Sequence, residues 1–130
     1  PNSVAVVDIN GDGIPDLAVG QINAMVSVFL GSGNGTFKAQ RQFKAGGGSN
    51  SVTVADVNGD GNRDILVANQ TFGDFSVLLG NGTRNFQAQQ RFAAGVTPTA
   101  MTVVDLNGDG KPDVVTANRN GNSVSVILHR

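Results

Sequence analysis

The amino-acid sequence predicts an all-β protein made of three successive small antiparallel sheets. Three observations carry this prediction. Short Val-rich runs are separated by turns rich in Gly and Asn, one acidic nine-residue segment occurs three times, and the apolar runs that flank it recur with it. Short apolar runs bounded by such turn residues are typical of β-strands.

The spacing of the acidic segments predicts the architecture. Asp8 lies 48 residues before Asp56, which lies 49 residues before Asp105. A period of 40–50 residues with four short strands per repeat is typical of a β-propeller blade. We therefore interpret residues 1–130 as a single propeller segment, with blade 1 at 1–50, blade 2 at 51–99 and an incomplete blade 3 at 100–130.

The first three strands of each repeat are predicted from runs with hydrophobic residues on both faces, which suit strands packed between neighbouring sheets. The first strand precedes the acidic segment at residues 3–8, 51–56 and 100–105. The second follows it at residues 16–19, 64–69 and 113–118, and the third occupies residues 26–31, 75–80 and 124–128.

The fourth strand is predicted at residues 36–43 and 85–92, where polar and apolar residues alternate. Alternation with one wet face indicates an outer strand, and the basic residues there discourage pairing with other molecules. We expect Phe37, Phe43, Phe86 and Phe92 to belong to the core between blades. The third repeat stops before such a segment, so its sheet is expected to lack the outer strand.

The acidic segments predict metal sites. All ten acidic residues are Asp, and nine of them occupy positions 1, 5 and 9 of the three segments, with Asn at position 3. Calcium takes six to eight oxygen ligands, and Gly at position 6 permits a sharp turn. Position 7 varies in type, as expected if its backbone carbonyl is the ligand. We predict three Ca²⁺ sites, one per repeat, with these ligands: Asp8, Asn10, Asp12, Ile14, Asp16; Asp56, Asn58, Asp60, Asn62, Asp64; Asp105, Asn107, Asp109, Lys111, Asp113.

Other interpretations of these loops fit less well. An EF-hand needs Glu at position 12, where this chain has Val19, Val67 and Thr116. Magnesium demands near-ideal octahedral geometry and keeps several waters. A plain Asn-Gly or Asp-Gly turn would explain one loop. It does not explain why Asp recurs at the same three positions in all three loops.

The pattern DxNGDGxPD at residues 8–16 and 105–113 resembles the FG-GAP or VCBS-type repeat, the blade of integrin α-subunit-like β-propellers. This resemblance implies four-stranded antiparallel blades with the calcium loop between the first two strands. The middle loop departs from the pattern, with Arg63 where the others have Pro15 and Pro112. No ligand is lost by this change, so we expect looser binding there rather than loss of the site.

Composition argues against several functions. The single His, His129, leaves little basis for a Ser-His-Asp enzyme, and no Gly-rich loop carries the lysine of a phosphate-binding motif. A net charge of −1 without a basic stripe argues against nucleic-acid binding. No apolar run approaches 18 residues, so no membrane insertion is expected. Phe72 and Phe75, which only the second repeat has, are the aromatic residues to watch for ligand contact.

We therefore expect a non-catalytic, extracellular module for adhesion or recognition of a glycan or protein. Two alternatives remain open: an accessory propeller domain of a secreted polysaccharide-active enzyme, and a purely structural spacer. Propellers close with four to eight blades, so three blades do not close a ring. We expect the rest of the ring to come from a homodimer with six blades or from the remainder of a longer chain.

Overall fold

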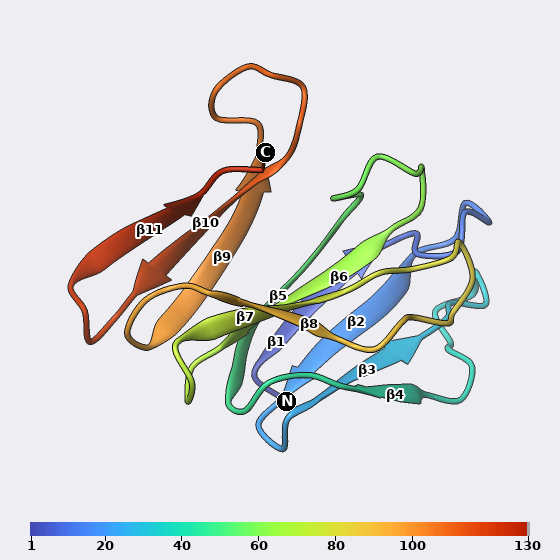
Figure 1. Cartoon of the computed structure of the whole chain (residues 1–130). Helices are drawn as coiled ribbons and strands as arrows, with labels where there is room; N and C mark the ends of the chain where they lie inside the picture. Colours follow the sequence, from blue (N-terminus) through green and yellow to red (C-terminus); the bar gives the residue numbers. More distant parts are fainter. Residues whose placement is uncertain (130) are drawn as a thin grey trace.

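Eleven β-strands form three antiparallel sheets in the part of the chain that the structure describes, residues 1–129 without the side chains of residues 49 and 50. The structure is a computed structural model, shown in Figure 1. Blade 1 contains β1 (Ser3–Val7), β2 (Asp16–Gln21), β3 (Met25–Phe29) and β4 (Arg41–Lys44). Blade 2 contains β5 (Ser49–Ala55), β6 (Asp64–Asn69), β7 (Asp74–Leu78) and β8 (Gln90–Ala93). Blade 3 contains β9 (Pro98–Val104), β10 (Asp113–Asn118) and β11 (Ser123–Ile127).

Each sheet follows the order of its strands in the sequence, so the predicted all-β fold and blade topology are confirmed. The sheet orders are β1-β2-β3-β4, β5-β6-β7-β8 and β11-β10-β9. Blade 3 has no outer strand within residues 1–129, so β11 forms the edge of its sheet. The register is equivalent in the first two blades, where Val26 lies opposite Phe43 and Phe75 lies opposite Phe92.

The fourth strands are shorter than the sequence predicts, because each contains a one-residue irregularity. In blade 1, Val28 lies opposite Arg41 while Gly31 forms an isolated bridge with Phe37. The outer segment therefore places one more residue between these pairs than β3 does. Gly80 and Phe86 form the same isolated bridge in blade 2. An extra residue of this kind behaves as a β-bulge, which interrupts pairing and changes the face that later side chains occupy.

This extra residue corrects the expectation that all four Phe residues lie in the core. Phe86 packs against Phe43 of blade 1, with ring centroids 5.2 Å apart. Phe92 instead stacks on Phe75 of its own blade at 5.3 Å and remains 43% exposed. Phe37, at the position equivalent to Phe86, is 44% exposed. The two Phe residues of one outer segment thus face opposite neighbours.

The hydrophobic core lies between the blades rather than inside any one sheet. At the first junction, between blades 1 and 2, Ile65 and Val67 pack with Val26 and Val28. At the second junction, between blades 2 and 3, Leu66 and Phe75 pack with buried residues of blade 3 that include Met101 and Val114. Every residue of β6 is buried, because this strand contacts a neighbouring blade on each face.

The two ends of the row of blades are apolar sheet faces that no described residue covers. Val4 and Val6 of β1 are 58% and 64% exposed, whereas Val52 at the equivalent position of β5 is buried. At the other end, Val124 and Val126 of β11 are 64% and 53% exposed. None of residues 1–129 belongs to a helix long and apolar enough to cross a membrane.

Candidate metal centres

The acidic loops connect the first two strands of each blade and share most of their hydrogen bonds. In blade 1, one Asp8 carboxylate oxygen accepts bonds from the backbone N–H groups of Gly11 and Asp12, at 2.8 and 3.2 Å. The other oxygen accepts a bond from Gly13 N–H at 2.8 Å. Gly11 and Gly13 have φ of 77° and 80°, a left-handed conformation that favours glycine. The backbone of the loop therefore folds around the carboxylate of the position-1 Asp.

The middle of the loop is held by its position-3 and position-5 side chains. Asn10 Nδ2 donates to one carboxylate oxygen of Asp12 at 3.1 Å, and the other oxygen accepts from Ile14 N–H at 2.8 Å. The same pair of bonds links Asn58, Asp60 and Asn62 in blade 2. It also links Asn107, Asp109 and Lys111 in blade 3. Positions 3, 5 and 7 of the three predicted sites are therefore hydrogen-bonded alike.

The position-9 Asp residues are fully buried anchors between the loop and the third strand. Asp16 accepts bonds from Ile9 N–H and Gly31 N–H, both at 2.8 Å. Asp64 is bonded in the same way by Val57 and Gly80, and Asp113 by Leu106 and His129. Sequence reasoning treated these residues only as ligands and missed the second anchor point. The sequence feature that could have predicted this contact is the Gly after the third strand of repeats 1 and 2, which is Gly31 and Gly80.

That Gly is required because the backbone passes very close to the end of the acidic loop. A Cβ added to Gly31 would lie 2.2 Å from the carbonyl oxygen of Pro15. A Cβ on Gly80 would lie 2.1 Å from the carbonyl oxygen of Arg63. In blade 3, the residue that donates the equivalent bond is His129, so the third blade departs from the pattern at this point.

The carboxylates converge best in the first loop. Asp8, Asp12 and Asp16 each offer an oxygen, and these atoms lie within 4.8 Å of one another. Two oxygens that bind one Ca²⁺ at about 2.3–2.6 Å can be separated by up to about 5 Å. The donor set also consists of the hard oxygen ligands that calcium prefers. Among the His, Cys, Asp and Glu side chains of residues 1–129, this is the one group of three that meets this distance, so the fit to a cation is clearest in blade 1.

Backbone N–H groups set the charge state of several of these carboxylates. Bonds from Gly13, Gly11 and Asp12, with a contribution from the Arg63 guanidinium, hold the pKa of Asp8 below its ordinary value. The Asn62 N–H and the Asn58 side chain lower the pKa of Asp60, and His129 and Leu106 lower that of Asp113. Burial raises the pKa of Asp64, with the nearby Asp60 and Asp56 charges acting in the same direction. Asp8, Asp60 and Asp113 are thus held in the ionised form that a cation requires.

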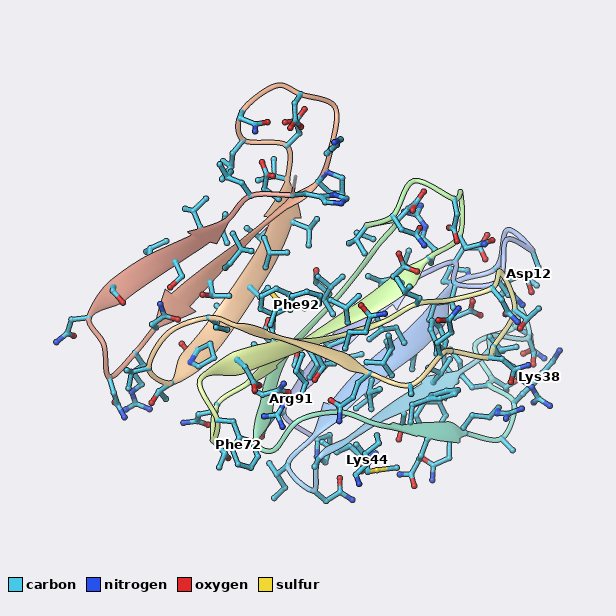
Figure 2. The ribbon with its side chains drawn as sticks, viewed as in Figure 1. Asp12, Lys38, Lys44, Phe72, Arg91 and Phe92 are labelled. Atoms are coloured by element: carbon cyan, nitrogen blue, oxygen red, sulfur yellow. The ribbon has the colours of Figure 1, made fainter. Side chains whose placement is uncertain are left out.

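A second polar cluster lies at the end of blade 2 opposite its acidic loop. Asp74 forms an ion pair with Arg91, whose guanidinium carbon lies 4.8 Å from the centre of the Phe72 ring. Phe72 is 61% exposed, and Figure 2 shows it beside Arg91, far from Asp12. Phe75, the other aromatic residue that only this repeat has, is buried and belongs to the core. The sequence singled out Phe72 as a candidate for ligand contact, but it did not predict the contact between the Phe72 ring and the Arg91 guanidinium.

Comparison with known families gives a direct assignment. A family model described as an FG-GAP-like repeat matches residues 8–67 and again residues 56–116. The two matches together span most of the chain, and each includes acidic loops and the strands that follow them. The chain therefore belongs to the FG-GAP-like repeat family. No curated protein matches the chain in a direct comparison of sequences.

Proposed function

We propose that the chain is a calcium-stabilised β-propeller module that recognises a glycan or protein and catalyses no reaction. The observation that carries the calcium proposal is the convergence of the Asp8, Asp12 and Asp16 oxygens in a loop whose hydrogen bonds recur in all three blades. In each repeat, the ion would be held by the Asp residues at positions 1, 5 and 9. The Asn at position 3 and the backbone carbonyl at position 7 complete the ligand set.

A bound calcium ion supplies positive charge between three carboxylates that otherwise repel one another. The chain's own residues then tie that charge to the fold. The position-1 Asp organises the loop through its backbone bonds, and the position-9 Asp joins the loop to the third strand. With free calcium at about 100 times the dissociation constant, each site adds about 2.7 kcal/mol to the free energy of unfolding. The function of the ion in this proposal is structural.

The Phe72 cluster is the part of the surface that we propose contacts the ligand. An exposed aromatic ring beside an Arg–Asp pair offers an apolar face together with hydrogen-bond donors and acceptors. Aromatic and Arg side chains are enriched where proteins bind one another. A Cβ added to Gly47 would lie 2.9 Å from the Phe72 ring, so the backbone of the connection after blade 1 lies directly beside this surface.

The proposed setting is extracellular, where millimolar calcium would fill loops of modest affinity. The apolar end faces at Val4 and Val6 and at Val124 and Val126 support association with further blades. These blades belong either to a second copy, which would give a six-bladed ring, or to the remainder of a longer chain.

Thermal unfolding tests the calcium proposal. Asp12→Ala, Asp60→Ala and Asp109→Ala should each remove about one bound calcium and lower the melting temperature in calcium. Their melting temperatures in chelator should differ little from that of the parent. Asp74→Ala is the control for the response to calcium: Asp74 is the single Asp outside the loops, so this variant should keep the calcium-dependent rise in melting temperature although it loses the ion pair with Arg91. Since the chain has no Trp or Tyr, unfolding is followed by far-ultraviolet circular dichroism. Identical melting curves with calcium and with chelator would overturn the proposal.

Binding to an array of glycans and to candidate surface proteins tests the recognition proposal. Phe72→Ala should abolish binding to any ligand found, while Phe37→Ala, which alters another exposed Phe, should leave binding unchanged. If Phe72→Ala binds as well as the parent chain, the proposed contact surface is wrong.

A further inference from the structure

The outer segment of blade 1 carries three cations, which we call the cation row. Lys38, Arg41 and Lys44 follow one another at intervals of three residues, and all three are exposed. Residues 17–55 contain no Asp or Glu, and in the described part of the chain the one ion pair lies in blade 2. The cations of the row therefore have no carboxylate partner among the described residues.

The outer segment of blade 2 shows that these positions do not require charge. The register of the two sheets makes Arg41 equivalent to Gln90, and the positions three residues to either side of Gln90 are Gln87 and Ala93. All three residues of blade 2 are uncharged and exposed, although blade 2 lies between two neighbours. These positions thus stay accessible where blades flank the sheet on both sides. Because the outer strand of blade 2 forms without cations, protection of a sheet edge does not account for the difference.

A fourth cation comes from blade 2 and lies near the middle of the cation row. The guanidinium carbon of Arg41 lies 6.0 Å from the centre of the Phe43 ring, which packs on Phe86 with centroids 5.2 Å apart. Arg84 is exposed and precedes Phe86 by two residues, which span at most about 7 Å of backbone. The contact between the two rings therefore brings the outer segments of both blades, and their cations, to one part of the rim.

The spacing of the cation row fits an acidic glycan. Three residues of an extended segment span about 10 Å, and Figure 2 shows Lys38 and Lys44 near opposite ends of the outer segment of blade 1. This interval is close to the length of one disaccharide. Arg41 and Lys44 leave β4 on opposite faces, and their long side chains reach the rim of the sheet from both. The row ends three residues before Gly47, where an added Cβ would lie 2.9 Å from the Phe72 ring.

We propose that the cation row binds an acidic polysaccharide with one carboxylate per disaccharide, which lies along the outer segment of blade 1 and extends toward Phe72. Lysine and arginine donate charge-assisted hydrogen bonds to carboxylates, so successive cations hold successive acidic sugars. A duplex nucleic acid carries one charge per about 1.7 Å of its length, far more closely spaced than these cations. The inference rests on the proposed recognition function and deepens it by naming the class of glycan.

A fluorescein-labelled hyaluronan decasaccharide, which has one carboxylate per disaccharide, is the probe. It is added to the full chain in millimolar calcium and followed by fluorescence anisotropy. We expect saturable binding that weakens as the salt concentration rises, because exposed charges are screened. Lys38→Gln and Arg41→Gln each introduce the residue that blade 2 has at the equivalent position, and each should weaken binding about two- to fivefold. The triple variant, which adds Lys44→Ala, should weaken binding by at least about tenfold.

Arg119→Gln is the matched control, because it removes an exposed cation from the connection between β10 and β11. It should bind hyaluronan as well as the parent chain, and a neutral dextran oligosaccharide of the same length should not bind. Circular dichroism checks that each variant is folded. Absence of saturable binding, equal binding by the triple variant, or an equal loss in Arg119→Gln would overturn the proposal. Equally tight binding of a DNA oligonucleotide would also overturn it, because the surface would then respond to any negative charge.

The same variants separate this inference from the proposed recognition function. A neutral glycan whose binding is lost in Phe72→Ala but kept in the triple variant would overturn the inference and leave the recognition proposal standing. Hyaluronan binding that is lost in the triple variant but kept in Phe72→Ala would support the cation row and show that the proposed contact at Phe72 is wrong.

Discussion

The two junctions between blades are built from the same sequence pattern but are covered to different extents. At the first junction, Phe86 closes the outer part of the interface by packing on Phe43. At the second, the equivalent Phe92 is 43% exposed beside a groove of about 330 Å³. The comparison teaches that the outer segment of blade 2 covers the junction with blade 1. Residues 1–129 contain no equivalent segment in blade 3, and within these residues Phe92 is partly uncovered.

Substitutions in β6, the fully buried strand of blade 2, should show the largest difference in stability from equivalent substitutions in blade 1. Ile65→Ala removes a side chain that is 0% exposed at the first junction and should lower the free energy of unfolding by about 2–5 kcal/mol. Leu17→Ala is the matched control, because Leu17 occupies the equivalent position of blade 1 and is half-buried at the end of the row. Its cost should be clearly smaller. Chemical denaturation followed by circular dichroism measures both, and equal costs would contradict the proposed burial of the first junction.

The aromatic contact should give the next largest difference. Phe86→Ala should cost about 2–3 kcal/mol, because it removes a partly buried ring and its edge-on contact with Phe43. Phe37→Ala, at the equivalent position of blade 1, should cost less than about 1 kcal/mol, since Phe37 is 44% exposed. Unfolding in urea compares the two variants. A larger loss for Phe37→Ala would mean that the outer segment seals a different junction.

The residue that follows the third strand should not tolerate a side chain in blade 2, where it is Gly80, whereas in blade 3 it is His129. Gly80→Ala places a Cβ 2.1 Å from a backbone oxygen, so the end of the acidic loop must shift, at a cost of about 2 kcal/mol. His129 already carries a side chain at this position of blade 3, so His129→Ala should change stability by less than about 0.5 kcal/mol. Melting temperatures test the pair. A neutral Gly80→Ala variant would show that the close approach is easily relieved.

A smaller effect is expected from lowering the pH, which should release calcium from the middle and third loops at different pH values. Burial raises the pKa of Asp64, so its protonation begins above the ordinary value of 3.8, whereas Asp113 stays ionised below that value. Because bound calcium requires ionised ligands, the middle loop should release its ion at higher pH than the third. Without calcium, the lowered pKa of Asp113 contributes stability that is fully present above the ordinary value of 3.8 and is lost as the pH falls through the lowered pKa. The raised pKa of Asp64 acts in the opposite direction, because protonation of Asp64 favours the fold. Calcium titrations between pH 3.5 and 6 of the Asp60→Ala and Asp109→Ala variants distinguish the two sites, and release in the opposite order would contradict this assignment.

The repeats made the architecture predictable, and local packing explains what was missed. Apolar runs on both faces predicted the inner strands, because such runs must be buried between neighbours. The outer segments were predicted as continuous alternating strands, yet one extra residue between the Phe37 bridge and Arg41 reverses the face of the later side chains. Sequence alternation alone does not reveal such an insertion, because its effect depends on the partner strand.

The candidate site was predictable to a similar degree. Positions 1, 3 and 5 of each loop follow from residue type and spacing, and in each blade the position-1 Asp accepts a bond from the backbone N–H of the Gly at position 4. The burial of Asp16, Asp64 and Asp113 and their bonds to the end of the third strand join residues 15 or 16 apart in sequence. Those contacts arise only when the sheet has formed, so no local sequence pattern predicts them.

Calorimetric titration of the calcium-free chain with Ca²⁺ tests the central claim most directly. The account predicts three bound ions per chain, reduced to two by Asp12→Ala, Asp60→Ala or Asp109→Ala and unchanged by Asp74→Ala. No heat of binding and no change in melting temperature at millimolar calcium would contradict it.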